Sequence, residues 1–243
     1  MKGYPKINNR ENIYVEVLDT KSYARCVAEE ISTLTNMFVE KKSFVNICLS
    51  GGRTPLDVYK CLATPPITLA FPWSKTVFFV GDERWTTDLS LKNSESIKSH
   101  LLLEQKETTF IDWVGNDIDE AMINFERQIT NKDIDKTGFD IVLLGVGEDG
   151  HIASIFPGSV LLDKMVYRTF STESNMPRLT IGPSLILNSA RIIVLIRGEN
   201  KQEITKKIFF ETHSIQDLPA ELIFEAKGIV QFFLDNKASK LLA

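Results

Sequence analysis

The sequence predicts an α/β fold: a single three-layer domain over residues 1–243, Rossmann-like, with a mostly parallel central sheet and helices on both faces. Two observations predict it. Several short runs are apolar at nearly every position, which is typical of strands covered on both sides. These runs alternate with segments of helical periodicity. With 43% hydrophobic and 25% charged residues among 243, the composition excludes disordered, collagen-like and disulfide-scaffold classes.

The elements follow in order along the chain. The predicted strands are Phe44–Leu49, Thr76–Val80, Phe139–Val146, Arg191–Arg197 and Gly228–Leu234. Apolar residues at helical spacing predict helices over Leu56–Leu62, Ser94–Glu104, Ile118–Ile129 and Lys201–Phe210. Thr54 is expected to cap the first helix, with Pro55 at its first position. The loops Pro65–Trp73 and Asn131–Gly138 do not have the composition of domain linkers, which favours one domain.

Charge and patterning exclude several function classes. The net charge is −4, so a global basic field for nucleic acid is absent. Apolar runs such as Ile192–Ile196 are far too short to span a membrane, and the polar N-terminus lacks the apolar stretch of a signal peptide. Cys26, Cys48 and Cys61 cannot all pair, so we interpret them as reduced thiols of a cytoplasmic protein. The sequence has none of the metal-site patterns that we sought.

Polar segments follow the predicted strands. Ligands of open α/β sheets bind beyond the carboxyl ends of the strands, so these segments are expected to converge on one edge. In the first, Gly51 and Gly52 let backbone N–H groups approach an anion, and the helix that follows favours phosphate. Arg53 and Thr54 belong to the same segment. The alternative is a plain tight turn, since neither a P-loop nor a GxGxxG pattern is present.

Charged side chains occur at two more strand ends. Asp82, Glu83 and Arg84 follow the second strand, and this set is suited to orienting a polyol and stabilising an oxyanion. A solvated turn with a local ion pair is the alternative. Lys201 opens a helix after a strand, where phosphate would gain a point charge and a helix terminus. Arg178 is a further isolated cation, and either residue alone is typical of a surface charge.

The segment GVGEDGH carries the clearest chemical pattern. A glycine-rich turn at the end of a buried strand presents Asp149 and His151, two residues apart. Histidine is the natural general base near neutral pH, and Asp149 is placed to orient its ring. The other histidines, His100 and His213, lie in segments typical of structural positions.

In combination, LSGGRTP, VGDERW, GVGEDGHIASIFPGS and PRLTIG with RGENK resemble the 6-phosphogluconolactonase family. Order and approximate spacing match from about Phe44 to Leu234. The resemblance implies hydrolysis of 6-phospho-D-glucono-1,5-lactone to 6-phospho-D-gluconate in the oxidative pentose phosphate pathway. It also implies a cytoplasmic enzyme that needs neither a metal nor an organic cofactor. A monomer and a homodimer both remain open.

The resemblance also implies roles for individual residues. His151 matches the family's general base that activates water, and Asp149 supports it. Arg84 and Glu83 complete the expected catalytic set. The expected substrate-binding residues are Gly51, Gly52, Arg53, Thr54, Asp82, Arg178 and Lys201.

Some positions depart from the family pattern. Glu148 replaces a usual proline and Ile152 a usual threonine, which is closer to glucosamine-6-phosphate deaminase of the same superfamily. Phe156, however, stands where that deaminase has a catalytic glutamate. The segment before Asn93 also differs, so no substrate role is assigned to Asn93. A phosphosugar deaminase or isomerase and a non-catalytic sugar-phosphate sensor are the alternative functions.

Overall fold

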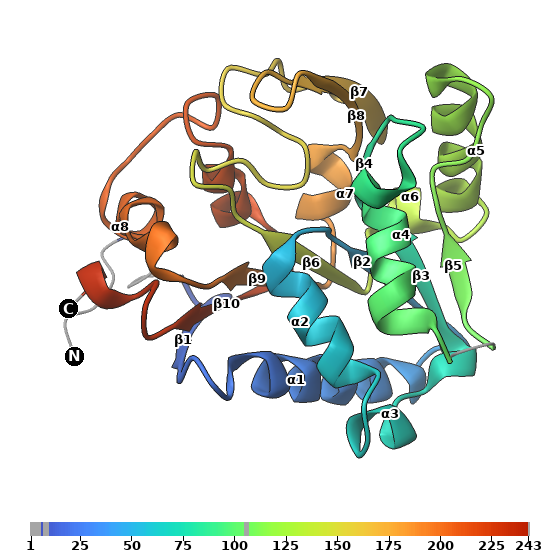
Figure 1. Ribbon diagram of the computed structural model, residues 1–243, viewed down its shortest axis with the longest axis horizontal. Coiled ribbons are helices and arrows are strands. Elements are labelled where there is room, and N and C mark those ends of the chain that lie inside the picture. The colour runs from blue at the N-terminus through green and yellow to red at the C-terminus, as the bar shows by residue number, and fades with distance from the viewer. Residues whose placement is uncertain (1–5, 7–9, 105–106, 243) are drawn as a thin grey trace.

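The computed structural model describes residues 6, 10–104 and 107–242. Within this part of the chain, seven strands form one sheet in which every neighbouring pair is parallel, in the order β1-β10-β9-β6-β2-β3-β5 (Figure 1). The strands are β1 (Ile13–Leu18), β2 (Val45–Leu49), β3 (Thr76–Val80), β5 (Thr109–Ile111), β6 (Ile141–Gly145), β9 (Arg191–Ile196) and β10 (Ile229–Asp235). The predicted parallel α/β fold is confirmed.

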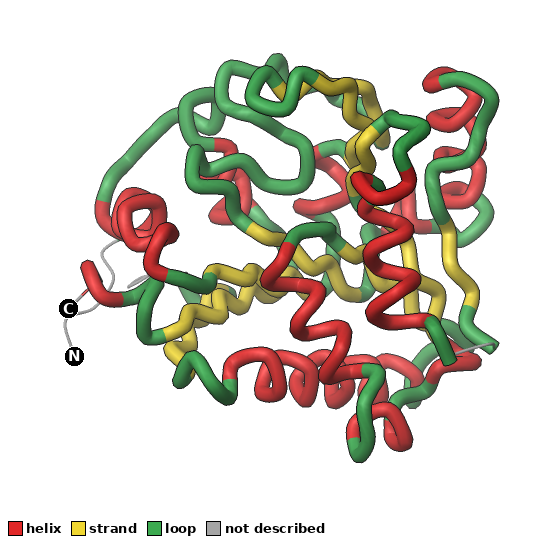
Figure 2. The backbone as a smooth tube through the Cα atoms, viewed as in Figure 1, coloured by secondary structure: helices red, strands yellow, loops and turns green. Residues whose placement is uncertain are grey.

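A second, antiparallel sheet of three strands lies above the parallel one in the view of Figure 1. It consists of β4 (Asp82–Arg84), β8 (Met176–Ile181) and β7 (Val166–Ser171), in that order. Loops gather along the same upper edge (Figure 2). Because β4 begins two residues after β3 ends, the small sheet places its side chains directly at the carboxyl end of the parallel sheet.

Helices follow most of the parallel strands. The α-helices are α1 (Tyr23–Val39), α2 (Arg53–Leu62), α3 (Ile67–Ala70), α4 (Asn93–Ile97), α5 (Ile118–Thr130), α6 (Ile134–Thr137), α7 (Pro183–Leu187) and α8 (Gln202–Phe210). Short 3₁₀ segments are η1 (Trp73–Lys75), η2 (Leu89–Leu91), η4 (Glu199–Lys201), η5 (Pro219–Glu225) and η6 (Lys240–Leu242), and a π-helical turn η3 (Lys98–Leu102) continues α4.

Aromatic side chains join the parallel sheet to helices on both faces. Phe78 and Phe79 are adjacent in β3, so their side chains point to opposite faces. Phe78 contacts Phe71, which follows α3, while Phe79 contacts Phe125 of α5 at 5.9 Å between ring centroids. Both strand residues are fully buried, which accounts for the continuous apolar pattern of this strand.

The structure corrects the predicted start of one helix and adds elements. Helix α2 begins at Arg53, with Gly52 as its N-cap residue, so Thr54 and Pro55 are its second and third residues. The predicted Thr54 cap and the predicted first position of Pro55 are therefore both wrong. The φ of Gly52 is +96°, a conformation that glycine adopts more readily than threonine. Strands β1 and β5, helices α1 and α7 and the small sheet were not predicted from the sequence, and the predicted loops Pro65–Trp73 and Asn131–Gly138 contain the short helices α3 and α6.

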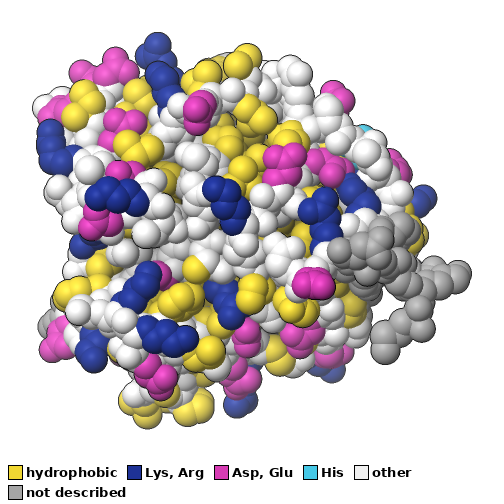
Figure 3. Space-filling view, turned by 180° about the vertical axis from the view of Figure 1, so that it is seen from behind, with side chains coloured by type: hydrophobic (Ala, Val, Ile, Leu, Met, Phe, Trp, Pro, Cys, Tyr) yellow, Lys and Arg dark blue, Asp and Glu magenta, His cyan; other side chains and the backbone are white. Residues whose placement is uncertain are grey.

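Several other predictions have outcomes in the described residues. The three cysteines are free thiols, as expected. Among these residues, no helix is long and apolar enough to cross a membrane. On the face drawn in Figure 3, Lys and Arg side chains are interspersed with Asp and Glu. Part of the polar N-terminal segment (residues 1–5 and 7–9) lies outside the described residues, and the one-domain assignment stays a prediction.

Candidate active site

A cleft of about 940 Å³ opens at the carboxyl edge of the parallel sheet. The loops after β2, β6 and β9 line it together with β4 and the β7–β8 hairpin. The predicted residues that line it are Gly51, Gly52, Arg53, Thr54, Asp82, Arg84, His151, Arg178 and Lys201. Segments far apart in sequence therefore meet, as the strand-end rule predicts. Glu83 and Asp149 were predicted with them but are not among the residues that line the cleft: Glu83 is buried, and Asp149 contacts His151.

The His151 imidazole is held from two sides. Its Nδ1 lies 2.6 Å from Oδ1 of Asp149, and its ring centroid lies 5.0 Å from that of Phe156. The turn is closed by the Gly147 N–H, which donates to the His151 carbonyl at 2.9 Å. Burial would raise the pKa of Asp149, but the hydrogen bond and charge of His151 outweigh it and hold that pKa below its usual value. The contact on Nδ1 leaves Nε2 for a ligand in the cleft.

Glycine at position 147 is required by this arrangement. A Cβ there would lie 2.1 Å from Nδ1 of His151 and 2.4 Å from Oδ1 of Asp149. The turn thus accommodates the hydrogen-bonded pair only because Gly147 has no side chain. Gly150, in the same turn, has a φ of +86°, which favours glycine.

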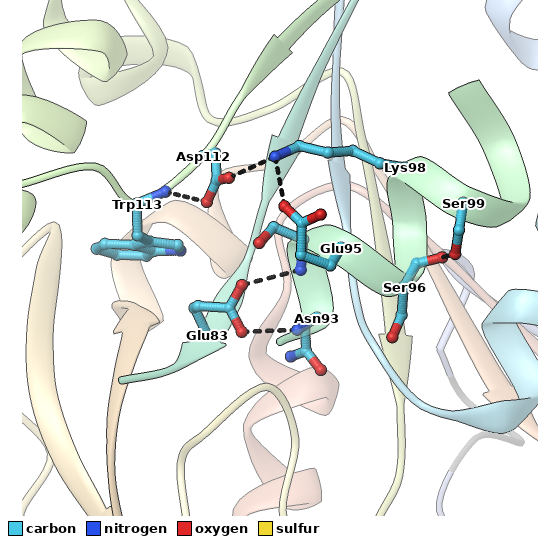
Figure 4. Close-up of polar contacts among 9 residues, drawn as sticks. Glu83, Asn93, Glu95, Ser96, Lys98, Ser99, Asp112 and Trp113 are labelled. Atoms are coloured by element: carbon cyan, nitrogen blue, oxygen red, sulfur yellow. Dashed lines mark hydrogen bonds and ion pairs between the residues drawn. The ribbon is translucent and has the colours of Figure 1, made fainter. Parts of the chain in front are cut away.

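The three residues of β4 divide between two environments. Alternation along a strand places Asp82 and Arg84 on one side and Glu83 on the other. Glu83 is buried and accepts hydrogen bonds from the backbone N–H groups of Arg84, Asn93 and Ser94 at 2.7–2.8 Å. Figure 4 shows the contact with Asn93. Burial raises the pKa of Glu83, and these N–H donors act in the opposite direction. Its carboxylate therefore anchors the start of α4.

Asp82 ties the His151 loop to the small sheet. Its Oδ2 accepts a hydrogen bond of 2.7 Å from the hydroxyl of Ser154, three residues after His151. The Ser154 N–H in turn donates to Oγ1 of Thr180 in β8 at 3.3 Å. Asp82 and Ser154 are both buried, so this contact is protected from water and fixes the loop that carries the imidazole.

Arg178 is a buried cation beside another cation. It pairs with Arg84 across the β4–β8 ladder and donates from Nη2 to the Ser174 hydroxyl at 3.0 Å. Its buried Nε has no hydrogen-bond partner among the described residues. Burial lowers the pKa of Arg178, and the charge of Arg84 lowers it further. A guanidinium with an unsatisfied buried donor is suited to binding an anion.

Lys201, the last residue of η4, also lines the cleft. Burial lowers the pKa of Lys201, the carboxylates of Glu148 and Asp149 raise it, and Arg53 lowers it. Glu148 accepts a hydrogen bond from the Asn200 side chain, which connects the His151 loop to the loop after β9. In the described part of the chain, none of the ion pairs within 4.0 Å includes Arg53, Arg84, Arg178 or Lys201.

Several residues of the cleft wall were not predicted from the sequence. Arg197 follows β9 directly and pairs with Asp57 of α2 at 2.7 Å, so the strand-end rule could have found it. Ser154 and Glu173 had no comparable pattern, because their positions depend on the fold of their loops. The described residues contain no cluster of three or more His, Cys, Asp or Glu side chains able to hold a metal ion.

Comparisons with known proteins show the family of this chain. The model of the family described as glucosamine-6-phosphate isomerases/6-phosphogluconolactonase matches residues 18–232. A 6-phosphogluconolactonase of Thermotoga maritima is 32% identical over 217 residues, which cover 86% of this chain and 93% of that protein. A 6-phosphogluconolactonase of Haemophilus influenzae is 30% identical over 206 residues, covering 82% and 88%.

Solved structures have the same fold. The crystal structure of the Thermotoga maritima 6-phosphogluconolactonase superposes with a TM-score of 0.78 at 30% identity, covering 92% of this chain and 100% of that one. A monomeric glucosamine-6-phosphate deaminase, with a TM-score of 0.79 at 20% identity over 94% of this chain and 99% of that one, shares the fold alone. Since the family model matches residues 18–232, which include every residue that lines the cleft, this chain belongs to the glucosamine-6-phosphate isomerase/6-phosphogluconolactonase family.

Proposed function

We propose that this protein hydrolyses 6-phospho-D-glucono-1,5-lactone to 6-phospho-D-gluconate, as a cytoplasmic enzyme of the oxidative pentose phosphate pathway. One observation carries the proposal: an imidazole anchored at Nδ1 by Asp149 shares a cleft with cations that have no carboxylate partner. A δ-lactone is an activated ester, so its hydrolysis needs a base and an electrostatic site for the oxyanion but no covalent nucleophile.

The reaction begins with water activated by His151. Nε2 takes a proton from the water as its oxygen attacks C1, and the C–O π electrons move onto the carbonyl oxygen. Asp149 stabilises the imidazolium that forms through the 2.6 Å contact at Nδ1. Arg84 or Arg53 stabilises the developing negative charge, since both line the cleft. When the carbonyl re-forms, the C1–O5 bond breaks and the ring oxygen takes the proton from Nε2.

The phosphate provides binding energy remote from C1. Arg178 and Lys201 are the cations proposed to bind it, together with the backbone N–H groups of the Gly51–Thr54 segment at the start of α2. Binding the distant phosphate positions C1 near the imidazole, which converts binding energy into orientation.

Asp82 and Glu83 act indirectly in this proposal. Their carboxylates are occupied by Ser154 and by the backbone N–H groups at the start of α4, respectively. These contacts support positioning roles for both, in place of the direct substrate contact and catalytic step expected from the sequence. Neither a metal nor an organic cofactor enters the proposed reaction.

The direct test uses purified protein and freshly prepared lactone. We expect product to form faster than by spontaneous ring opening, with no ammonia released from glucosamine-6-phosphate. Ammonia release would instead favour a deaminase, for which Phe156 lacks the required carboxylate. Tight binding of 6-phosphogluconate by both wild type and His151→Ala, with no hydrolysis by either, would favour a sugar-phosphate sensor.

A further inference from the structure

Asn93 connects three parts of the cleft without an assigned role in the reaction. It is the first residue of α4 and only 4% of its surface is exposed. Its backbone N–H donates to Glu83 at 2.7 Å, which fixes the position of the residue (Figure 4). Its carboxamide is thereby directed toward Asp82 and Arg84 of β4 and lies in the wall of the cleft.

The two ends of the carboxamide have different partners. Nδ2 donates to the Asp82 carbonyl at 2.8 Å and lies 3.4 Å from the Asp82 carboxylate. Oδ1 accepts a hydrogen bond from Nη1 of Arg84, which also donates to the Leu91 carbonyl at 3.1 Å. An aspartate at position 93 would place negative oxygen against the oxygens of Asp82, so the site requires an amide. Because both hydrogen bonds use Nη1, the other nitrogen atoms of the Arg84 guanidinium remain available to a ligand in the cleft.

The Arg84 guanidinium needs such a restraint. Arg84 and Arg178 are directly paired across the β4–β8 ladder, and like charges at this spacing repel. Without the acceptors of Asn93 and Leu91, this repulsion would favour conformations in which Arg84 turns toward bulk solvent. The oxygens of Asn93 and Leu91 hold it in the cleft, where an anion can contact both guanidinium groups.

Asn93 also contacts the segment after β2. A Cβ on Gly51 would lie 2.1 Å from Oδ1, 2.3 Å from Cγ and 2.8 Å from Nδ2 of Asn93, the three atoms nearest to it. The φ of Gly51 lies outside the left-handed region, so its backbone would accept alanine. Gly51 is therefore required by the close approach of the Asn93 side chain.

We propose that Asn93 is a positioning residue that holds Arg84 beside Arg178 and sets their spacing from the Gly51–Thr54 segment. The inference rests on the proposed lactonase function for its kinetic consequences. Asn93 acts through Arg84, and it does so with an amide that cannot be exchanged for a carboxylate.

The first test is a double-mutant cycle in kcat/KM for the lactone. Loss of a hydrogen bond to a charged group predicts that Asn93→Ala lowers kcat/KM by about 10-fold to 100-fold. The double variant Arg84→Ala/Asn93→Ala is expected to be no slower than Arg84→Ala alone, because Asn93 has nothing left to position. Additive losses, or wild-type kcat/KM in Asn93→Ala, would overturn the proposal.

The second test is a rescue at Gly51. Gly51→Ala is expected to lower both the thermal midpoint and kcat/KM in the wild-type background. In the Asn93→Ala background the added methyl group finds space, so Gly51→Ala should lower the thermal midpoint little further. Equal losses in both backgrounds would show that Gly51 is required for another reason and would refute the packing argument.

Controls separate this inference from the proposed function. Ser94→Ala changes the next buried residue and keeps the backbone N–H that Glu83 binds, so it should retain kcat/KM within about threefold of wild type. Asn93→Asp should lose more thermal stability than Ser94→Ala, because its carboxylate faces Asp82. If wild type does not hydrolyse the lactone, the proposed function fails. The inference is then decided by the Gly51 rescue in thermal midpoint and by a crystal structure of Asn93→Ala, in which an unmoved Arg84 would refute it.

Discussion

Gly147→Ala is expected to displace the general base without unfolding the protein. The added Cβ would lie 2.1 Å from Nδ1 of His151, whereas ordinary van der Waals contact begins at 3.4 Å. The ring must therefore retreat by about 1.3 Å, and misplacement of a reacting group by about 1 Å costs on the order of 100-fold in rate. The φ of Gly147 is not positive, so the loss would not arise from backbone strain.

The assay follows kcat for the lactone together with the affinity for 6-phosphogluconate. We expect kcat to fall by on the order of 100-fold while the dissociation constant changes by less than about threefold, because the phosphate-binding cations are untouched. A Gly147→Ala enzyme with wild-type kcat would refute the reasoning.

Three further predictions concern the base and the phosphate. His151→Ala should lower kcat by about 10²-fold to 10⁴-fold, the usual contribution of a general base, and should keep the affinity for 6-phosphogluconate in calorimetry. Lys201→Glu should raise KM strongly with an unchanged thermal midpoint, and an unchanged KM would remove the phosphate assignment. Burial lowers the pKa of Lys201, so 6-phosphogluconate affinity should be full below that pKa and fall as pH rises through it. Lys201→Arg should abolish this fall, and its persistence in calorimetry would exclude Lys201 as the cause.

The sequence was most informative where burial is complete. Strands β2, β3, β6, β9 and β10 have continuous apolar patterns because both faces of the sheet are covered, and all five were predicted within two residues at each end. Strand β1 lies at the edge of the sheet and is partly exposed, so its pattern is weaker. Helix α1 was missed although its buried residues, including Tyr23, Val27, Ile31 and Leu34, recur at helical spacing.

The side-chain directions at the cleft depended on contacts that are distant in sequence. The segment Asp82–Arg84 was predicted to follow a strand, but the sequence did not indicate that it forms a strand itself. Alternation within β4 separates Glu83 from its neighbours, and its pairing with β8 brings Arg178 beside Arg84. Neither fact follows from local periodicity, because antiparallel pairing between distant segments is decided by the packing of the whole domain.

The charge of the cleft follows from which side chains are already paired. Around it, the carboxylates of Asp82, Glu83 and Asp149 accept hydrogen bonds from neighbouring protein groups. The cations Arg178 and Lys201 have no carboxylate within ion-pair distance in the described part of the chain. A chain with a net charge of −4 can therefore present cations without ion-pair partners in its cleft, while Asp57, Asp82, Glu148 and Glu173 line the same cleft. Neutralising one of these carboxylates should displace the protein groups that it binds more than it alters the electrostatic field of the cleft. Removing a cation, in contrast, should lower the affinity for phosphate directly.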